Sequence, residues 1–229
     1  MHPTTTFLAC LATFLPLISA HGTLTEIRGA NGVNMNGLSI PANSRNKNSI
    51  ANTAIIRDSE IKSGRASPLG RTSGGGAVTA ASALQAFSRA AGAGAGNAAT
   101  LPTAADDGTV TVIYHQVNGD GAGPLDAAID GTSGGTQANA FKTAQILQNV
   151  PGNNGRSSAS NKDFTVKVKM PAGMTCDGTV GGVQNVCIVR VRNPAGPFGG
   201  AAAFTQSAKS RKRAEEFRKA RRSEVAFTA

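Results

Sequence analysis

The chain has no tryptophan and a single tyrosine among its 229 residues. These absences exclude a core built on large aromatic rings, so valine, isoleucine, leucine and phenylalanine must fill it. They also count against a polysaccharide-cleaving surface, because sugar-binding faces usually present flat aromatic rings. Glycine is frequent, at 28 residues, and this composition is typical of a loop-rich protein of one domain.

Long apolar segments are also scarce, and the one at the start of the chain has a specific interpretation. The run from Phe7 to Ala20 is too short to span a bilayer and ends in a small residue, Ala20. We therefore expect residues 1–20 to be a removed secretory signal, although the segment before the run lacks Lys and Arg. This predicts a secreted, extracellular protein with no transmembrane segment in its mature form.

Histidine occurs three times, and cleavage after Ala20 would make His21 the first residue of the mature chain. His2 would leave with the signal, so His21 and His115 would remain. The α-amine and ring of His21 can chelate a metal ion together, and imidazole ligands suit copper. With His115 they would form a three-nitrogen histidine brace. The alternative is that His21 merely follows the cleavage site and His115 is a hydrogen-bonded strand histidine, and the residues alone favour it.

Cysteine is equally scarce. Cys10 lies in the signal, which leaves Cys176 and Cys187, and we expect them to form a disulfide in an oxidising compartment. Closing a loop of this length would stabilise the fold by roughly 3 kcal/mol, and packing must supply the rest.

The formal net charge of +10 is unevenly distributed. Residues 206–229 hold eight basic and three acidic residues, a net of +5. Such a tail is typically a solvated helix or disordered. Its dibasic pairs would also suit a processing protease, and its charge would suit a polyanionic wall or membrane surface. We expect no nucleic-acid partner, because export removes the protein from nucleic acid.

Alternation of apolar and polar residues dominates the region from His21 to residue 205. It predicts strands at Gly22–Arg28, Thr53–Arg57 and Thr109–Asn118, and it places His115 on the opposite face from Tyr114. Phe141–Leu147 could be strand or helix, and the alanine-rich segment Ala77–Ala91 could be a helix or an ordered insertion.

Two further alternating segments, Phe164–Met170 and Cys187–Asn193, flank the expected disulfide. They predict a long hairpin with a glycine-rich tip at Asp177–Gln184. Short strands divided by Gly, Pro and Asn loops favour an all-β fold, an antiparallel β-sandwich. We therefore expect a signal at 1–20, one β-sandwich domain at 21–205, a basic tail at 206–229, and a monomer.

Several motifs together resemble the fungal Egh-like secreted virulence factors, also described as appressorium-specific proteins. The resemblance covers roughly His21 to Ala203, and members of that family likewise begin with His-Gly after signal removal. Its motifs here are Ile55-Ile56-Arg57-Asp58, Gly70-Arg71-Thr72, the run from His115 to Pro124, the loop from Val150 to Gly155, Met170-Pro171-Ala172-Gly173, and Gly196-Pro197-Phe198-Gly199-Gly200. The chain departs from the family where further cysteines are expected, at Leu69, Ala127, Val191 and Ala201.

The resemblance implies a fungal pathogen protein deployed as the host is penetrated. In general layout the family is similar to lytic polysaccharide monooxygenases, immunoglobulin-like β-sandwich enzymes whose N-terminal histidine brace holds copper. It therefore implies copper on His21 and His115, with Phe198 filling the axial position unless that ring simply packs in a turn. Gln116 and Asn118 could support the site, but a regular strand would turn both away from His115.

Whether the protein is an enzyme stays open. As a copper-dependent monooxygenase it would oxidise cell-wall polysaccharide. Without an aromatic platform it could instead be a non-catalytic effector that binds copper, a cell-wall polysaccharide or another host surface polymer. A glycoside hydrolase would need a carboxylate pair, and the spacing of Asp106, Asp120 and Asp126 singles out none. A serine or cysteine hydrolase would need the histidine that the brace uses.

Overall fold

The computed structural model describes residues 21–90 and 101–227. The expected signal at residues 1–20 lies outside the described residues, so cleavage after Ala20 stays a prediction.

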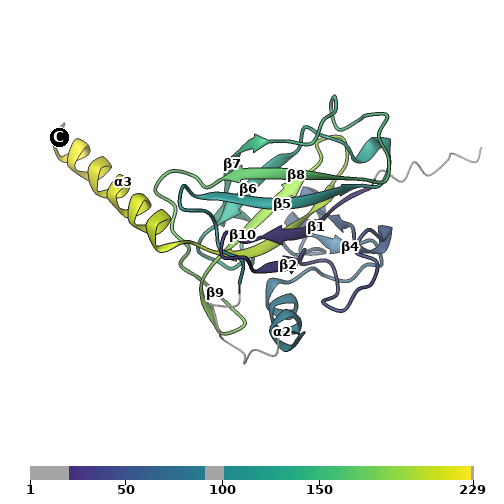
Figure 1. The fold of residues 1–229 in the computed structure, drawn as a ribbon, viewed down its shortest axis with the longest axis horizontal. Coiled ribbons are helices and arrows are strands. Elements are labelled where there is room, and N and C mark those ends of the chain that lie inside the picture. The colour runs from purple at the N-terminus through teal and green to yellow at the C-terminus, as the bar shows by residue number, and fades with distance from the viewer. Residues whose placement is uncertain (1–20, 91–100, 228–229) are drawn as a thin grey trace, which may run out of the picture.

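The fold is one antiparallel sheet of eleven strands, ordered β2-β1-β5-β8-β7-β6-β10-β11-β3-β4, with β9 paired to β10 (Figure 1). The strands are β1 (Gly22–Arg28), β2 (Asn34–Asn36), β3 (Ala54–Ile55), β4 (Arg71–Thr72), β5 (Thr109–Gln116), β6 (Asp126–Asp130), β7 (Phe141–Gln148), β8 (Lys162–Lys169), β9 (Gly178–Val180), β10 (Val183–Arg192) and β11 (Phe198–Thr205). The helices are α1 (Asp58–Lys62), α2 (Ala80–Ala90) and α3 (Ala208–Phe227), with short 3-10 turns η1 (Ile50–Asn52), η3 (Gly119–Gly121) and η4 (Ala138–Ala140).

The sheet bends at β7 and curls back on itself. Ala144 in the first half of β7 pairs with Ala127 of β6, whereas Gln145 pairs with Lys169 of β8. We call β2, β1, β5 and β8 the β5 half-sheet, and β6, β10, β11, β3 and β4 the β10 half-sheet. The expected all-β class is confirmed, and the two layers expected of a sandwich are the two halves of this one sheet.

The two half-sheets enclose the hydrophobic core. Valine, isoleucine and leucine supply most of it, as the composition requires, and Tyr114 and Phe204 are its largest side chains. The hydroxyl of Tyr114 donates to the carbonyl of Gly121 at 3.0 Å, and burial raises the pKa of this phenol. The chain's one tyrosine therefore cannot form part of a sugar-binding surface.

Most expected elements are present. The strands β1 and β5 match the alternating segments, Phe141–Leu147 belongs to strand β7, and α2 lies in the alanine-rich segment. The predicted long hairpin, which paired Phe164–Met170 with Cys187–Asn193, is wrong. Strand β8 pairs with β5 and β7, whereas β10 pairs with β6, β9 and β11, so the two segments lie in different half-sheets.

The turn before β10 explains that difference. Gly181 and Gly182 both have positive φ, which permits a tight two-residue turn between β9 and β10. The short strand β9 therefore takes the place beside β10 that the prediction gave to β8.

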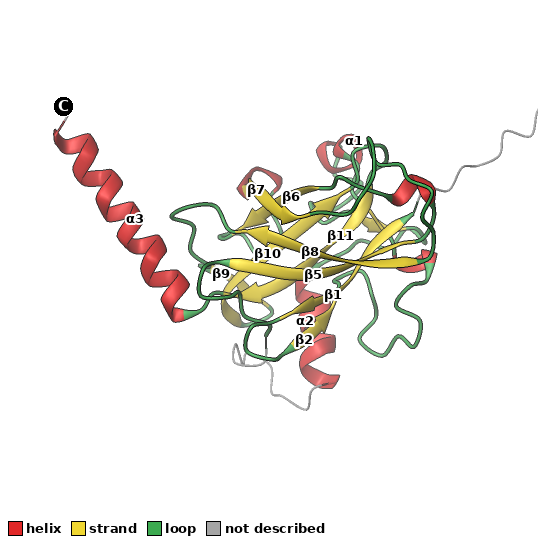
Figure 2. Cartoon of the chain, turned by 45° about the horizontal axis from the view of Figure 1, so that its top comes forward, coloured by secondary structure: helices red, strands yellow, loops and turns green. Residues whose placement is uncertain are grey.

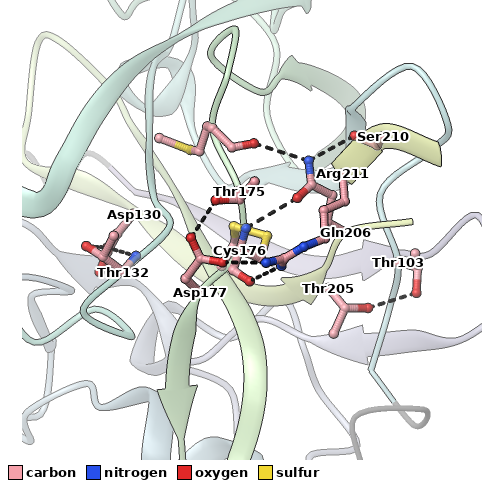
Figure 3. The surroundings of a disulfide bond; sticks show 12 residues. Thr103, Asp130, Thr132, Thr175, Cys176, Asp177, Thr205, Gln206, Ser210 and Arg211 are labelled. Carbon is pink, nitrogen blue, oxygen red and sulfur yellow. Dashed lines mark hydrogen bonds and ion pairs between the residues drawn. A yellow bond between two sulfur atoms is a disulfide. The ribbon is translucent and has the colours of Figure 1, made fainter. Parts of the chain in front are cut away.

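The disulfide Cys176–Cys187 is present and fastens the segment before β9 to β10 (Figure 3). The base of α3 is held to the same segment. Arg211 donates to the carbonyl of Cys176 at 3.1 Å and pairs with Asp177 at 2.9 Å. From this base α3 extends away from the sheet (Figures 1 and 2). No helix in the described ranges is long and apolar enough to cross a membrane.

Candidate metal centre

His21 and His115 lie close together in the pairing of β1 with β5. Thr23 is paired with His115 across β1 and β5, and His21 precedes Thr23 by two residues. The carbonyl of His21 accepts from Val117 at 3.0 Å, so the ladder continues to the start of the described chain. Side chains two residues apart on a strand share a face, and diagonal neighbours on adjacent strands stand roughly 7–8 Å apart. The pairing therefore brings the main chains of His21 and His115 to diagonal positions on neighbouring segments.

An aspartate orients the ring of His115. Asp163 lies opposite His115 in the pairing of β5 with β8, and the His115 Nδ1 to Asp163 Oδ1 distance is 2.6 Å. Because an ionised carboxylate only accepts, a neutral His115 ring facing it would carry its hydrogen on Nδ1, and Nε2 would keep its lone pair for another partner. A carboxylate behind one ring nitrogen is the usual support of a metal-binding histidine.

Sequence reasoning missed Asp163. The expected strand began at Phe164, one residue later, and Asp163 is 48 positions from His115. The contact between Asp163 and His115 could have been found only from the register of β5 with β8.

Asn118 contacts the main chain of His21. The nitrogen of His21 donates to Oδ1 of Asn118 at 3.1 Å. We expected Asn118 to point away, as on a regular strand, but β5 ends at Gln116 and the alternation ends with it. Gln116 is buried in the adjoining loops, where it donates to the Ser157 hydroxyl at 2.8 Å.

Phe198 lies against His21. Their ring centroids are 5.1 Å apart, with the planes tilted by 32°. Phe198 is half-buried at the start of β11, so it flanks the histidine from the other half-sheet. Its proposed axial role stays a prediction.

Two glycines permit the close packing around His21. A Cβ on Gly22 would lie 1.9 Å from the Tyr114 hydroxyl oxygen, and one on Gly121 would lie 2.1 Å from the carbonyl oxygen of His21. Real Cβ atoms do not approach other atoms so closely. Glycine at both positions is therefore a steric requirement of this fold.

Asn193 holds the loops beside Phe198 together. Its amide nitrogen donates to the carbonyls of Asp120, Ala122 and Gly155, and its amide oxygen accepts from two N–H groups that follow it. The main-chain nitrogen of Asn193 donates to the carbonyl of Phe198. One buried side chain thus holds three loops, and the main chain of the same residue holds the start of β11.

A metal at this place would need a main-chain ligand. Within residues 21–90 and 101–227, no three His, Cys, Asp or Glu side chains gather in a metal-binding arrangement. Two imidazoles are available, and the third nitrogen would be that of His21, which becomes an amine only if the chain is cut after Ala20. An all-nitrogen set of this kind suits copper, so the residues present fit the metal.

The acidic residues considered for a glycoside hydrolase have separate partners. Asp106 pairs with Lys209 at the base of α3, and Asp120 lies 3.5 Å from Arg156. Asp126 begins β6, opposite Arg192 of β10. The geometry therefore gives no reason to choose two of them as a catalytic pair.

Comparison with known proteins identifies the family. Residues 19–199 match the family described as Egh16-like virulence factor. The chain belongs to this family. The matched region includes His21, His115, Asp163 and Phe198, and it ends before α3.

Egh16-like relatives are found in Pyricularia oryzae. The chain is 46% identical to "Appressoria-specific virulence factor GAS2", over 90% of each chain. It is 30% identical to "Appressoria-specific virulence factor GAS1", over 82% of this chain and 72% of the relative. No solved structure matches the chain. The resemblance to the Egh-like family is therefore confirmed, while the immunoglobulin-like and monooxygenase-like layout stays a prediction.

Proposed function

We propose that this Egh16-like protein is a secreted virulence factor that acts at host penetration and binds one copper ion through His21 and His115. The names of its relatives in Pyricularia oryzae support the virulence role. The ligands are the amine and ring of His21 and the ring of His115.

One observation carries the copper proposal, the contact between His115 and Asp163. His115 is 2% exposed, whereas the side chain of Asp163 is 58% exposed, so the aspartate reaches inward from solvent to the ring. In a neutral ring this bond would place the hydrogen on Nδ1, and it aims Nε2 away from Asp163.

Two further residues, Asn118 and Phe198, contact His21. Asn118 fixes the direction of the His21 nitrogen, and Phe198 covers one side of the His21 ring. Copper bound there would supply one-electron chemistry with oxygen or peroxide when an external reductant is present.

A second candidate function follows from Tyr114. The chain has no tryptophan, and Tyr114 is fully buried, so neither residue type forms a platform for a sugar polymer. This favours a protein that binds copper, or a wall or host polymer, without oxidising it. Release of oxidised oligosaccharides that depends on a reductant would establish the monooxygenase. Copper binding without such release would establish the binding protein.

Copper(II) titration of the secreted protein tests copper binding, which the monooxygenase and the copper-binding protein have in common. We expect a tight one-to-one complex that His115→Ala abolishes. Thr111→Ala is the matched control, because Thr111 lies on the same face of β5, four residues away, and should keep the affinity. If His115→Ala bound copper as tightly as the unaltered protein, the proposal would be wrong.

A further inference from the structure

Two arginines project from the outer face of the β10 half-sheet. Val189 and Val191 are fully buried in the core, so the alternate residues Arg190 and Arg192 face outward. Both are half-buried, and they line a cleft of about 510 Å³. This volume lies within the usual range for small-molecule sites, roughly 300–1,000 Å³.

Small side chains make room for the cleft. Arg190 lies opposite Ala128 of β6, and Ala138 and Ala144 also line the space. Phe141 and Ile146 add half-buried apolar surface, and the cleft is otherwise polar. Asn149 lines it too, but its amide is bonded to the main chain of Leu125 and Val150.

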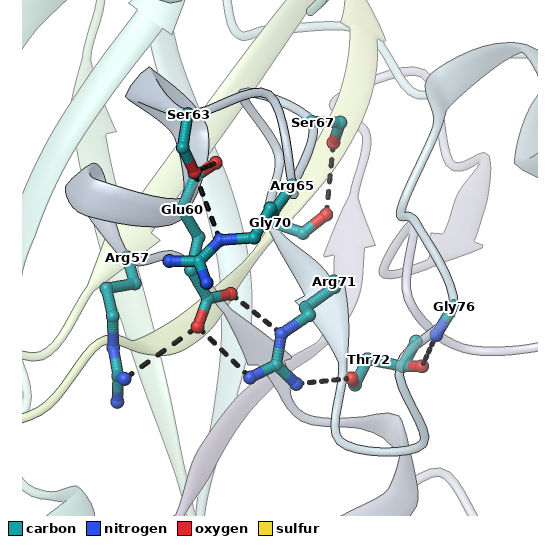
Figure 4. Close-up of polar contacts among 9 residues, drawn as sticks. All are labelled: Arg57, Glu60, Ser63, Arg65, Ser67, Gly70, Arg71, Thr72 and Gly76. Atoms are coloured by element: carbon teal, nitrogen blue, oxygen red, sulfur yellow. Dashed lines mark hydrogen bonds and ion pairs between the residues drawn. The ribbon is translucent and has the colours of Figure 1, made fainter.

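Arg190 differs from the other half-buried arginines of this half-sheet. Arg71 donates from Nε and Nη2 to the two carboxylate oxygens of Glu60, at 2.7 and 3.2 Å (Figure 4). Arg192 pairs with Asp58, with 2.8 Å between Nη1 and Oδ1. In the part of the chain that the structure describes, no carboxylate pairs with Arg190. Its guanidinium stacks on the Phe141 ring, 4.3 Å from the centroid, and Nη1 donates to the carbonyl of Pro68 at 2.6 Å.

This environment is costly for a lone cation. Burial lowers the pKa of Arg190, and the neighbouring charge of Arg192 lowers it further, against the opposing effect of Asp58. A half-buried guanidinium with one carbonyl acceptor still has donors to offer, and its planar fork fits a carboxylate. An anion in the cleft would supply the missing partner.

We propose that this cleft binds an acidic sugar, with the sugar carboxylate on Arg190 and a sugar hydroxyl donating to Asp126. Asp126 is an exposed carboxylate in the same cleft, opposite Arg192. It repels a doubly charged phosphate more than a singly charged carboxylate, and it is an acceptor for hydroxyls. The site is independent of copper and of the proposed metal centre.

Calorimetric titration of the full chain with trigalacturonate tests this proposal, since a short ligand carries the chemistry without spanning the protein. We expect binding of trigalacturonate but not of the neutral galactose trimer or of galactose phosphate. Arg190→Gln should weaken binding about tenfold or more, the scale of a lost charge-assisted contact.

Ala128→Leu is the second variant, because it fills the cleft while leaving the bond between Arg190 and Pro68 in place. It should also weaken binding about tenfold, with an unchanged near-ultraviolet circular dichroism spectrum. The basic end of α3 provides the control. A variant with Arg218, Lys219, Arg221 and Arg222 all changed to glutamine should bind as the unaltered protein does.

Three results would overturn the proposal. The first is equal binding of the neutral trimer or tighter binding of galactose phosphate. The second is unchanged affinity in Ala128→Leu, whatever Arg190→Gln does. The third is loss of binding in the α3 variant, which would mean that the ligand follows general charge and not the cleft.

Discussion

At the scale of single residues, the contact with Asp163 is what makes His115 a candidate metal ligand. The sequence alone identifies both histidines, because they are the two that remain after signal removal. It does not identify Asp163 or the contact of Asn118 with His21, because pairing between β5 and β8 and the end of β5 decide these contacts. Residue scarcity thus predicts candidate ligands, and only the fold identifies their supports.

Asp163→Ala should weaken copper(II) binding about 10- to 100-fold, the usual effect of removing a carboxylate that supports a metal-binding histidine. Its effect on the free energy of unfolding should be small, because the Asp163 side chain is mostly exposed. Competitive titration against a copper chelator measures the affinity. Thr165→Ala, two residues along the same face of β8, is the control. Equal affinities of Asp163→Ala and this control would show that Asp163 does not support a ligand.

Asp130 makes the stability of the protein depend on pH. Burial raises the pKa of this carboxyl, but hydrogen bonds from Ser133, Thr132 and Gly135 together lower it below its ordinary value of 3.8. A lowered pKa in the folded state means that the stabilisation is complete above the unfolded-state pKa. It is lost as the pH falls through the folded-state pKa.

Asp130→Asn should therefore lower the free energy of unfolding by about 2 kcal/mol at pH 7, the scale of hydrogen bonds to a charged group. The difference between the two proteins should shrink as the pH falls below about 4. Urea denaturation at pH 7, 5 and 3 measures it. A difference that stays constant across this range would contradict the assignment.

At the scale of elements, β11 shows what alternation cannot predict. Its residues Gly199 to Ala203 are all glycine or alanine, which carry no strand signal, so alternation predicted no strand there. The structure supplies the reason for their small size. A Cβ on Gly200 would lie 2.6 Å from Cβ of Leu24, so β1 and β11 approach each other through glycine.

Gly200→Ala should lower the free energy of unfolding by about 2 kcal/mol, because two packed strands must separate to admit the methyl group. Gly74→Ala is the control, since a Cβ there would have Thr72 Oγ1 as its nearest neighbour, at 3.9 Å. Chemical denaturation of both variants provides the comparison. If Gly74→Ala lowered the free energy of unfolding as much as Gly200→Ala does, the steric explanation would be wrong.

The disulfide was predictable from the count of cysteines, whereas the strands it joins were not. Alternation identified β8 and β10 and predicted that they pair in a hairpin, but the short β9 beside the Gly181-Gly182 turn pairs with β10 instead. Cys187 lies near the start of β10, and the proposed metal centre adjoins the other end of that strand through Asn193 and Phe198.

The double variant Cys176→Ala with Cys187→Ala should lower the free energy of unfolding by about 3 kcal/mol, as expected for a bridge that closes a short loop. Copper affinity should not change, because the bridge lies away from His21 and His115. Denaturation and copper titration of the same preparation measure both. A large fall in copper affinity in the folded variant would contradict this separation.

At the scale of the whole molecule, composition and alternation predicted the all-β class, and chain geometry decided the rest. The bend at β7 joins the two expected layers into one sheet, which a pattern with period two cannot indicate. Residues 206–229, expected to be helical or disordered, include α3, whose base is held by Arg211 while its basic end projects (Figure 2). Half of the net charge therefore lies in this tail, so the total charge says little about the proposed metal centre.

The central claim is that the amino terminus of the mature protein is a copper ligand. The most direct test compares copper(II) affinity of the protein beginning at His21 with that of the same protein carrying Ala20 before it. One added residue turns the amine into an amide while leaving both rings in place. We expect a tight one-to-one complex for the first protein and a loss of affinity of at least about tenfold for the second. Equal affinities would contradict it.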